Sequence, residues 1–275
     1  CRYMLSNMYD YDPAVHARPI DELPELDRWA LIRLNKLISN VRQGYEKFDF
    51  RQIIHELDYF CSVDMSSTYL DILKDRLYTF PKDSPLRRGS QMVLAKSVVA
   101  LTKLMAPILS FTSEEVWQML PPKVKAQEEW PSIHMANFPE PISVPDQQAV
   151  EARWKTLLAL RTLVLGALEQ QRREKVIGSS LEGKVGLEAL PDRYAFLQPY
   201  EPDLPALFIV SQVQVKPVET IEKSDYLVSD SDLGVGVNVT KADGVKCERC
   251  WNYRSSVGSN SEHPTLCDRC IKAVA

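Results

Sequence analysis

The 275-residue sequence lacks any continuous apolar run of about eighteen residues, the length that a membrane-spanning helix needs. Residues 1–7 also lack the basic-then-apolar order of a signal peptide. Both absences predict a cytoplasmic protein that has no membrane partner. The sequence begins without methionine and inside a plausible helix, so we expect a fragment of a longer protein.

Glycine and histidine are scarce, with ten and four residues, respectively. No glycine-rich loop of the kind that holds nucleotide phosphates is present. The histidines form no recognisable catalytic group, which favours a structural or surface role for each of them: His16, His55, His134 and His263. The sequence therefore predicts no catalytic residue in this chain.

Cysteine is confined mainly to the C-terminal tail, where Cys247, Cys250, Cys267 and Cys270 form two CxxC pairs sixteen residues apart. This spacing is typical of a structural zinc site, in which four thiolates fill the tetrahedron and leave no position for substrate water. Two disulfides in a secreted domain are the alternative, but nothing else in the sequence suggests export. We predict one structural zinc ion bound by the four cysteines.

The formal net charge of −4 argues against indiscriminate binding of nucleic acid, but two stretches are locally positive. Residues 74–103 hold seven basic side chains against two acidic ones, and residues 153–184 hold seven against three. Ordinary solvated helix faces would explain either stretch equally well.

The first half of the chain has the apolar periodicity of amphipathic helices. Apolar residues at three- and four-residue steps predict helices over about 26–45, 51–78 and 86–106, and we expect the basic residues of the third to face solvent. Thr112 and Glu115 predict a capping box that begins a shorter fourth helix. Because the turns between them are short, residues 1–142 are expected to form an antiparallel helical bundle.

The second half changes in character after a proline-rich stretch at residues 130–145. A long helix is expected over about 146–174 and a short one over 190–199. The β-branched and apolar runs at 185–187, 206–210, 213–215 and 235–239 predict a small sheet packed on the long helix, so residues 143–240 form a small α+β domain. Residues 241–275 are too few for a hydrophobic core, so zinc would hold them as a separate module. The predicted fold class is mainly α.

Several stretches resemble class I aminoacyl-tRNA synthetases. Residues 69–78 and 106–117 are similar to the anticodon-binding helical bundle of that family, and residues 172–182 resemble the segment that follows it. Residues 246–251 resemble a C-terminal zinc module. The bundle motifs are shared with the valyl and leucyl enzymes, but a four-cysteine module after residues 178–182 points to the C-terminal part of a bacterial-type isoleucyl-tRNA synthetase.

This resemblance implies an anticodon-binding bundle at 1–142, a junction domain at 143–240 and a zinc-binding module at 241–275. It implies two partners, tRNA(Ile) and the rest of the synthetase chain, and a monomeric parent enzyme. That enzyme attaches isoleucine to the tRNA using ATP. The two ATP-binding signatures of the catalytic domain are absent from the sequence. ATP and Mg²⁺ would therefore belong to a missing catalytic domain, the editing domain would be missing with it, and the fragment alone is predicted to be inactive.

An anticodon loop is read by stacking and by hydrogen bonds to base edges, whereas its stem is held through phosphates. Arg172, Arg173 and Lys175 cluster at the end of the long helix and are predicted to contact the tRNA backbone, with compensation of the helix dipole as the alternative. Arg249, Trp251 and Arg254 surround the first cysteine pair and are predicted to position or stack on nucleotides. The alternative for Trp251 is a place in the core of the zinc module.

Two other functions remain open at this point. A zinc-ribbon scaffold that binds a protein partner would bind no tRNA. The equivalent region of a valyl or leucyl enzyme would bind a different tRNA. The salt dependence of binding distinguishes a protein-binding scaffold from a tRNA-binding region. Contacts with phosphates weaken steeply as salt rises, whereas a mainly apolar protein interface responds little.

Overall fold

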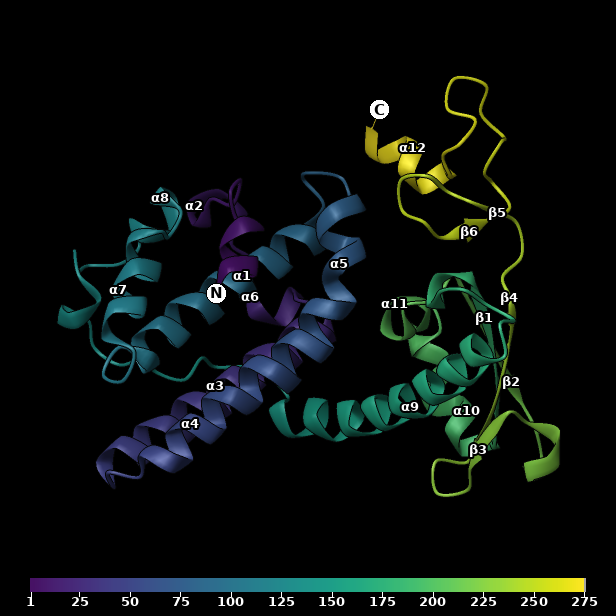
Figure 1. The fold of residues 1–275 in the computed structure, drawn as a ribbon, viewed down its shortest axis with the longest axis horizontal. Helices are drawn as coiled ribbons and strands as arrows, with labels where there is room; N and C mark the ends of the chain where they lie inside the picture. Colours follow the sequence, from purple (N-terminus) through teal and green to yellow (C-terminus); the bar gives the residue numbers. More distant parts are fainter. Residues whose placement is uncertain (275) are drawn as a thin grey trace. The chain divides into compact units, whose positions relative to one another are not determined.

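A computed structural model describes residues 1–274, apart from the side chain of Lys223 (Figure 1). The chain divides into two compact units. The first comprises Cys1–Tyr78 and Lys82–Glu151, and the second comprises Thr79–Pro81 and the chain from Ala152 onward. Within the described residues, no helix combines the length and the apolar character that crossing a bilayer requires. The predicted division at residues 142 and 240 stays a prediction.

The first unit is helical. Its elements are α1 (Arg2–Ser6), α2 (Pro13–His16), η1 (Ile20–Glu22), α3 (Glu25–Glu46), α4 (Phe50–Tyr59), η2 (Phe60–Tyr69), α5 (Leu70–Thr79), α6 (Pro85–Met105), α7 (Ser110–Gln118), α8 (Pro122–Lys125) and η3 (Ile133–Met135). The last residue of α5, Thr79, groups with the second unit. α3 packs against α4, η2 and α6. Because only three residues connect α3 to α4, these two helices run in opposite directions (Figure 1).

The core of this unit lies along α3, whose apolar residues recur at three- and four-residue steps. Leu26, Ala30, Leu34, Leu37 and Val41 are all buried. Full burial of a leucine side chain contributes about 1.5–3 kcal/mol relative to exposure. The helices predicted over 26–45 and 86–106 are confirmed as α3 and α6.

The helix predicted over 51–78, with a middle weakened by residues 66–68, is helical throughout, but η2 is a ten-residue π-helix between α4 and α5. Ser66 donates its hydroxyl to the carbonyl of Cys61, five residues earlier. Two polar contacts with α3 hold the wider turns: Arg33 donates to Asp64 at 2.9 Å, and Tyr69 donates to Asp27. These contacts tie the π-helix to α3 at two points.

The expectation that basic residues of α6 face the solvent is wrong for Arg87 and Arg88, which are 6% and 3% exposed. Arg87 donates from Nη1 and Nη2 to the two carboxylate oxygens of Asp10, at 2.8 and 3.0 Å. Arg88 Nη1 donates to the backbone carbonyl of Asp10 at 2.9 Å and to Gln91 at 2.8 Å. A buried arginine is tolerated only with such partners, and the charged partner, Asp10, lies 77 positions before Arg87 in the sequence.

The predicted capping box is also wrong. α7 begins at Ser110 with Leu109 as its N-cap, so Thr112 and Glu115 lie inside the helix. The neighbouring Glu114 makes the stabilising contact instead, because its carboxylate accepts hydrogen bonds from the hydroxyl of Ser132 and from the backbone amide of Ile133. The chain that returns after α8 is thereby fixed against α7.

The second unit combines the long helix α9 (Gln147–Arg173) with a four-stranded mixed sheet (Figure 1). The strands are β1 (Gly183–Ala189), β2 (Gln212–Pro217), β3 (Val228–Asp230) and β4 (Val235–Lys241), in the order β2-β1-β4-β3. β1 pairs parallel with β2 and antiparallel with β4. The inward residues of β1 and β4, including Val185, Leu187 and Val237, are buried. The predicted mainly helical chain with a small sheet is confirmed.

The strand predicted at residues 206–210 is wrong. α11 (Leu204–Phe208) occupies most of this stretch and ends where Ile209 adopts a left-handed conformation, with φ of 57°. A run of five apolar residues fits a buried strand or a buried helix equally well, and here Leu204, Leu207 and Phe208 bury one helical face. The short helix predicted over 190–199 is confirmed as α10 (Pro191–Leu197), whereas β3 was not predicted.

Short elements complete the second unit. They are η4 (Ser180–Glu182), η5 (Gln198–Tyr200), η6 (Lys223–Asp225), β5 (Val245–Lys246), β6 (Tyr253–Arg254) and α12 (Asp268–Val274). β5 and β6 pair as a two-stranded antiparallel hairpin that carries the first cysteine pair, and the second pair lies at the start of α12.

Candidate functional site

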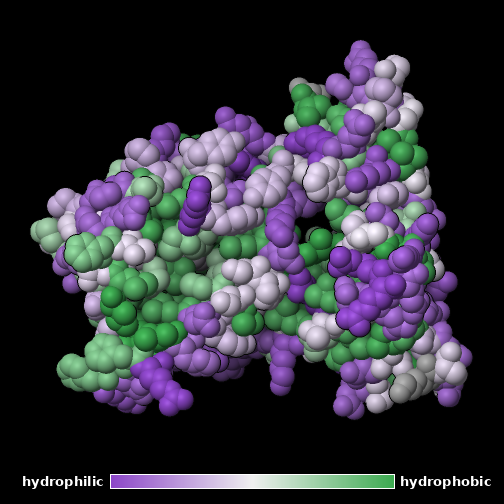
Figure 2. All heavy atoms as spheres, in the orientation of Figure 1, coloured by the Kyte–Doolittle hydropathy of each residue, from purple (hydrophilic) through white to green (hydrophobic). Residues whose placement is uncertain are grey.

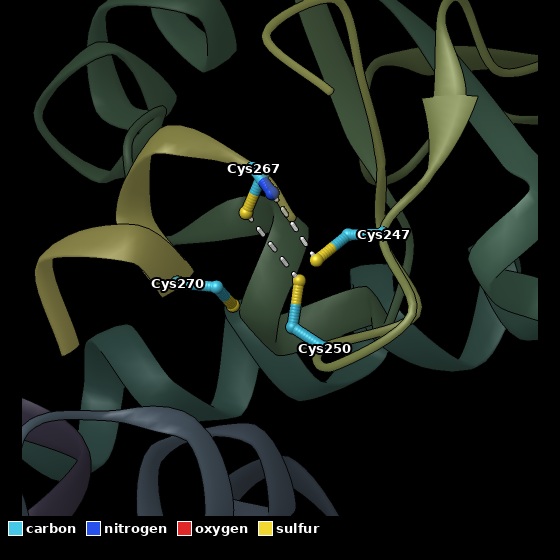
Figure 3. Close-up of side chains that lie close together, drawn as sticks. All are labelled: Cys247, Cys250, Cys267 and Cys270. Atoms are coloured by element: carbon cyan, nitrogen blue, oxygen red, sulfur yellow. Dashed lines mark hydrogen bonds between the residues drawn. The ribbon is translucent and has the colours of Figure 1, made fainter. Parts of the chain in front are cut away.

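The four C-terminal cysteines come together in one buried cluster. Their sulfur atoms all lie within 4.8 Å of one another, and the side chains point toward a common centre (Figure 3). Cys247, Cys267 and Cys270 are fully buried and Cys250 nearly so. The fold therefore brings the two cysteine pairs, sixteen residues apart in the sequence, to one point.

Backbone hydrogen bonds shape the first pair into a tight knuckle. The amide of Cys247 donates to the carbonyl of Asn252 at 2.9 Å, and the amide of Trp251 donates back to the carbonyl of Cys247 at 2.8 Å. Trp251 closes this turn with a φ of 64°, a left-handed conformation that is uncommon outside glycine. The two pairs meet through the amide of Cys267, which donates to the sulfur of Cys247 at 3.4 Å (Figure 3).

The donor set fits a tetrahedral zinc ion. Zinc–sulfur bonds of about 2.3 Å place neighbouring sulfurs of a tetrahedron about 3.8 Å apart. The sulfurs of Cys250 and Cys267 are 3.8 Å apart, much farther than the roughly 2.05 Å of a disulfide. In the described part of the chain, Val257 and Leu266 are the partly buried apolar residues that pack against the cysteines. So small an apolar core cannot hold this loop-rich segment without a further link between the thiols.

Burial and hydrogen bonding act on the thiols in opposite directions. Burial raises the pKa of Cys270 to about 12 and also raises that of Cys267. Burial opposes ionisation of Cys247 too, but the backbone amides of Cys250, Cys267 and Arg249 lower its pKa to about 6. Zinc binds thiolates, so a bound ion would supply the positive charge that four ionised sulfurs need in a buried site.

The three predicted nucleotide contacts near the first cysteine pair differ in their surroundings. Trp251 is 60% exposed and does not fill the core of the module. The ammonium of Lys246 lies 5.5 Å from the centre of its ring. Arg254 is exposed on β6. Arg249 is half-buried, and its Nη1 donates to the carbonyl of Thr79 and to the sulfur of Cys270.

The predicted basic cluster surrounds a hollow of about 350 Å³ at the C-terminal end of α9. Arg172, Arg173 and Lys175 line it together with Glu169, and hydrophilic side chains cover this end of the helix (Figure 2). Both arginines reach the carboxylate of Glu169, at 3.2 and 3.4 Å. The side chain of Arg173 is nevertheless 79% exposed, and Lys175 follows the helix with a φ of 59°. These cations are accessible to an anionic ligand.

Sequence reasoning missed the role of Glu182 beside this cluster. Its carboxylate accepts a hydrogen bond from the amide of Gly178 at 2.8 Å and one from the hydroxyl of Ser179 at 3.5 Å. The side chain thereby closes the turn that follows the basic residues. The four-residue spacing between Gly178 and Glu182 was the available signal.

The other basic stretch, residues 74–103, does not form an open cationic face. Most of its cations contact acidic partners within the first unit: Lys74 with Asp71, Arg76 with Asp27, Arg87 with Asp10, Arg88 with Asp10 and Asp83, and Lys103 with Glu128. Arg76, Arg87, Arg88 and Lys103 are mostly buried in these pairs and are therefore unavailable to a nucleic acid, whereas Lys74 stays exposed.

Comparison with known proteins finds one family match in the helical region and its continuation and another in the C-terminal cysteine module. Residues 27–187 match the family model described as the anticodon-binding domain of tRNA ligase, and residues 244–273 match a zinc finger found in FPG and IleRS. The chain is 42% identical over 276 residues to an isoleucine–tRNA ligase of Geobacter sulfurreducens, which covers 100% of this chain and 29% of the relative. An isoleucine–tRNA ligase of Desulfitobacterium hafniense is 43% identical over 275 residues, with the same two coverages. One of Syntrophotalea carbinolica is 44% identical over 272 residues, which is 98% of this chain and 28% of the relative. The chain thus spans less than a third of these curated relatives.

Proposed function

The chain belongs to the family of anticodon-binding domains of tRNA ligases, and from this membership we propose that it is the tRNA-binding C-terminal region of an isoleucine–tRNA ligase. The observation that carries the proposal is similarity along the whole chain, at 42–43% identity, to enzymes of that name. The anticodon-binding bundle, the junction domain and the zinc module keep their proposed bounds of 1–142, 143–240 and 241–275.

In this proposal the chain binds the anticodon stem-loop of tRNA(Ile), and the rest of a monomeric cytoplasmic synthetase attaches isoleucine with ATP and Mg²⁺. The chain covers 29% of its relatives, and its sequence holds no glycine-rich phosphate loop. Both facts support assigning the catalysis to the remaining part of the parent enzyme. The fragment itself would recognise tRNA and would not aminoacylate it.

We assign one structural zinc ion to Cys247, Cys250, Cys267 and Cys270. The buried cluster of four sulfurs and the match to a zinc-finger family support this assignment. Four thiolates leave no open coordination position, so the ion would organise the module and take no part in chemistry.

We assign contacts with the tRNA backbone to Arg172, Arg173 and Lys175. Their exposure around one hollow supports this role, because phosphate oxygens are held by accessible cations. Trp251 and Arg254 would contact unpaired nucleotides of the loop, since both side chains are exposed beside the rigid cysteine knuckle. Arg249 belongs to the same predicted set, but its Nη1 already has two partners within the protein.

A filter-binding titration of the 275-residue chain tests the proposal. We expect tighter binding of isoleucine tRNA than of methionine tRNA, together with a steep loss of affinity as the salt concentration rises. Three phosphate contacts would give a slope of about −2.7 in a plot of log affinity against log salt for duplex-like sites.

The alternatives predict different results in the same titration. A protein-interaction scaffold would bind neither tRNA. Absence of tRNA binding at every salt concentration would therefore overturn the tRNA assignment. The corresponding region of a valyl or leucyl enzyme would prefer the valine or leucine tRNA, so these two species are the specificity controls.

A further inference from the structure

Each of the two cysteine pairs has an arginine as its third residue, and both arginines reach one short segment of the chain. Arg249 belongs to the first pair and Arg269 to the second. The segment is Thr79–Pro81, which groups with the second unit although it lies about 170 positions earlier in the sequence. Equivalent positions of two knuckles therefore converge on the same target.

The contacts use both the backbone and the side chain of Thr79. Nη1 of Arg249 donates to the carbonyl oxygen of Thr79 and, at 3.6 Å, to the sulfur of Cys270. Nη2 of Arg269 donates to Oγ1 of Thr79 at 3.3 Å. The guanidinium carbon of Arg269 also lies 5.2 Å from the centre of the Phe80 ring, a cation–π distance. Thr79 is itself buried.

One nitrogen of Arg249, Nη1, donates both to Cys270, a candidate metal ligand, and to Thr79 of the segment. Four thiolates around a divalent ion leave a net charge of about −2, which a nearby guanidinium stabilises. Hydrogen bonds from such outer residues fix the orientation of a metal ligand, and their removal typically weakens metal binding about 10–100-fold. Because Nη1 of Arg249 contacts both groups, loss of either contact is expected to alter the other.

We propose that the cysteine module captures the Thr79–Pro81 segment, with Arg249 and Arg269 as positioning residues that couple retention of zinc to the order of this segment. The inference rests on the proposed zinc site but not on tRNA binding, because its contacts lie within the protein. The coupling is reciprocal: if the bound ion orders the segment, the segment must strengthen binding of the ion by the same factor.

Zinc affinity and hydrogen exchange test the coupling in the 275-residue chain without tRNA. Competition with a chelator measures zinc affinity for the wild type and for Arg249→Gln and Arg269→Gln. We expect about a 10–100-fold loss for Arg249→Gln. In the zinc-loaded proteins, both substitutions should speed amide exchange in peptides that contain Thr79 and Phe80. Lys272→Gln is the matched control, because it removes one exposed positive charge from the same module.

A change in the captured segment tests the reverse direction. Phe80→Leu removes the ring under Arg269 and alters no residue of the cysteine module, so it remains informative if an arginine variant fails to fold. Loss of one cation–π contact predicts about a two- to fivefold weaker binding of zinc. Faster exchange at Thr79 should accompany it.

The outcomes of these experiments test the coupling, the zinc site and the proposed function separately. Zinc affinities of the arginine variants and of Phe80→Leu that match the affinity of Lys272→Gln would overturn the coupling, as would unchanged exchange at residues 79 and 80. A wild-type chain that binds no zinc would overturn the zinc site itself. Failure to bind tRNA with the coupling intact would count against the proposed function and leave this inference standing.

Discussion

Tyr69 donates its hydroxyl to the carboxylate of Asp27 at 2.5 Å, and neither side chain is exposed to solvent. Arg76 and Ser90 donate to the same carboxylate, at 3.0 and 3.3 Å. This contact ties the π-helix η2 to α3 at the point where α5 begins. A carboxylate can be buried here because charged and neutral donors surround it.

Tyr69→Phe should lower the free energy of unfolding by about 1–3 kcal/mol, because it leaves one oxygen of a buried carboxylate with fewer donors. Urea denaturation followed by circular dichroism measures the change. Tyr59→Phe is the control, since Tyr59 is a partly exposed tyrosine of the neighbouring helix. Equal effects of the two substitutions would show that the buried hydrogen bond contributes nothing of its own.

Asp10 should make the free energy of unfolding of the helical unit depend on pH in the acidic range. Burial alone would raise its pKa, but hydrogen bonds from Arg87 and Gln91 and the charges of Arg87 and Arg88 lower it from 3.8 to about 2. A pKa that is lower in the folded state means that the carboxylate stabilises the fold above about pH 4 and loses this effect as the pH falls toward 2. Asp10→Asn should destabilise the protein by about 3 kcal/mol near neutral pH, because it removes the carboxylate that pairs with the buried Arg87 and leaves the buried Arg88 only its contact with Asp83.

The difference in unfolding free energy between wild type and Asp10→Asn should shrink between about pH 4 and pH 2. Asp83→Asn is the matched control, since Asp83 also contacts Arg88 but its side chain is 89% exposed. Its effect should stay below about 1 kcal/mol. A difference that is constant from pH 7 to pH 2 would assign the effect of Asp10 to packing and not to charge.

The reduced chain should contain one zinc ion, and Cys250→Ser should lose it. A hydroxyl is a poor substitute for the thiolate that zinc prefers in such sites. Elemental analysis measures the metal, and we expect the tail to unfold while most of the helical circular dichroism signal survives. Cys61→Ser provides the control, because Cys61 lies outside the cluster. Loss of most helical signal in Cys250→Ser would contradict separate cores for the module and the helices.

Arg173→Ala should weaken binding to different tRNAs alike and reduce the salt slope by about one unit, because a phosphate contact carries no sequence information. Lys155→Ala removes an exposed cation from the same helix at a distance from the basic hollow and serves as the control. An unchanged slope in Arg173→Ala would limit this arginine to its contact with Glu169 and to compensation of the helix dipole.

Trp251→Ala should leave zinc content and thermal stability unchanged, because the side chain is 60% exposed. If the indole stacks on an unpaired base, tRNA affinity should fall about 5–150-fold, which corresponds to about 1–3 kcal/mol. Loss of zinc would instead identify the side chain as part of the folded core of the module.

Trp251→Gly distinguishes the effect of the indole ring on tRNA affinity from the effect of the backbone conformation at this position. Trp251 has a φ of 64°, which glycine adopts without strain, so this variant should be at least as stable as Trp251→Ala. Equal losses of tRNA affinity in both variants would assign the effect to the missing ring. Recovery of affinity in the glycine variant alone would assign it to the geometry of the turn.

The sequence by itself determined the features that depend on local spacing. The apolar periods of α3, α6 and α9 indicated long amphipathic helices because one face of each must be buried. The CxxC pairs indicated a metal site since each spacing presents two thiols on one turn, and the sulfurs do lie within 4.8 Å of one another. Zinc binding itself stays a prediction.

Only the tertiary structure decided features that depend on distant partners. Leu204, Leu207 and Phe208 form a helical face because the neighbouring sheet offers a surface for it, although the apolar run alone fits a strand. Arg87 is buried because Asp10, 77 positions earlier, neutralises it. Arg249 reaches Thr79 across 170 positions. Periodicity and motif spacing report on neighbours along the chain, whereas charge pairing and the choice between helix and strand in short apolar runs are set by residues that folding alone brings together.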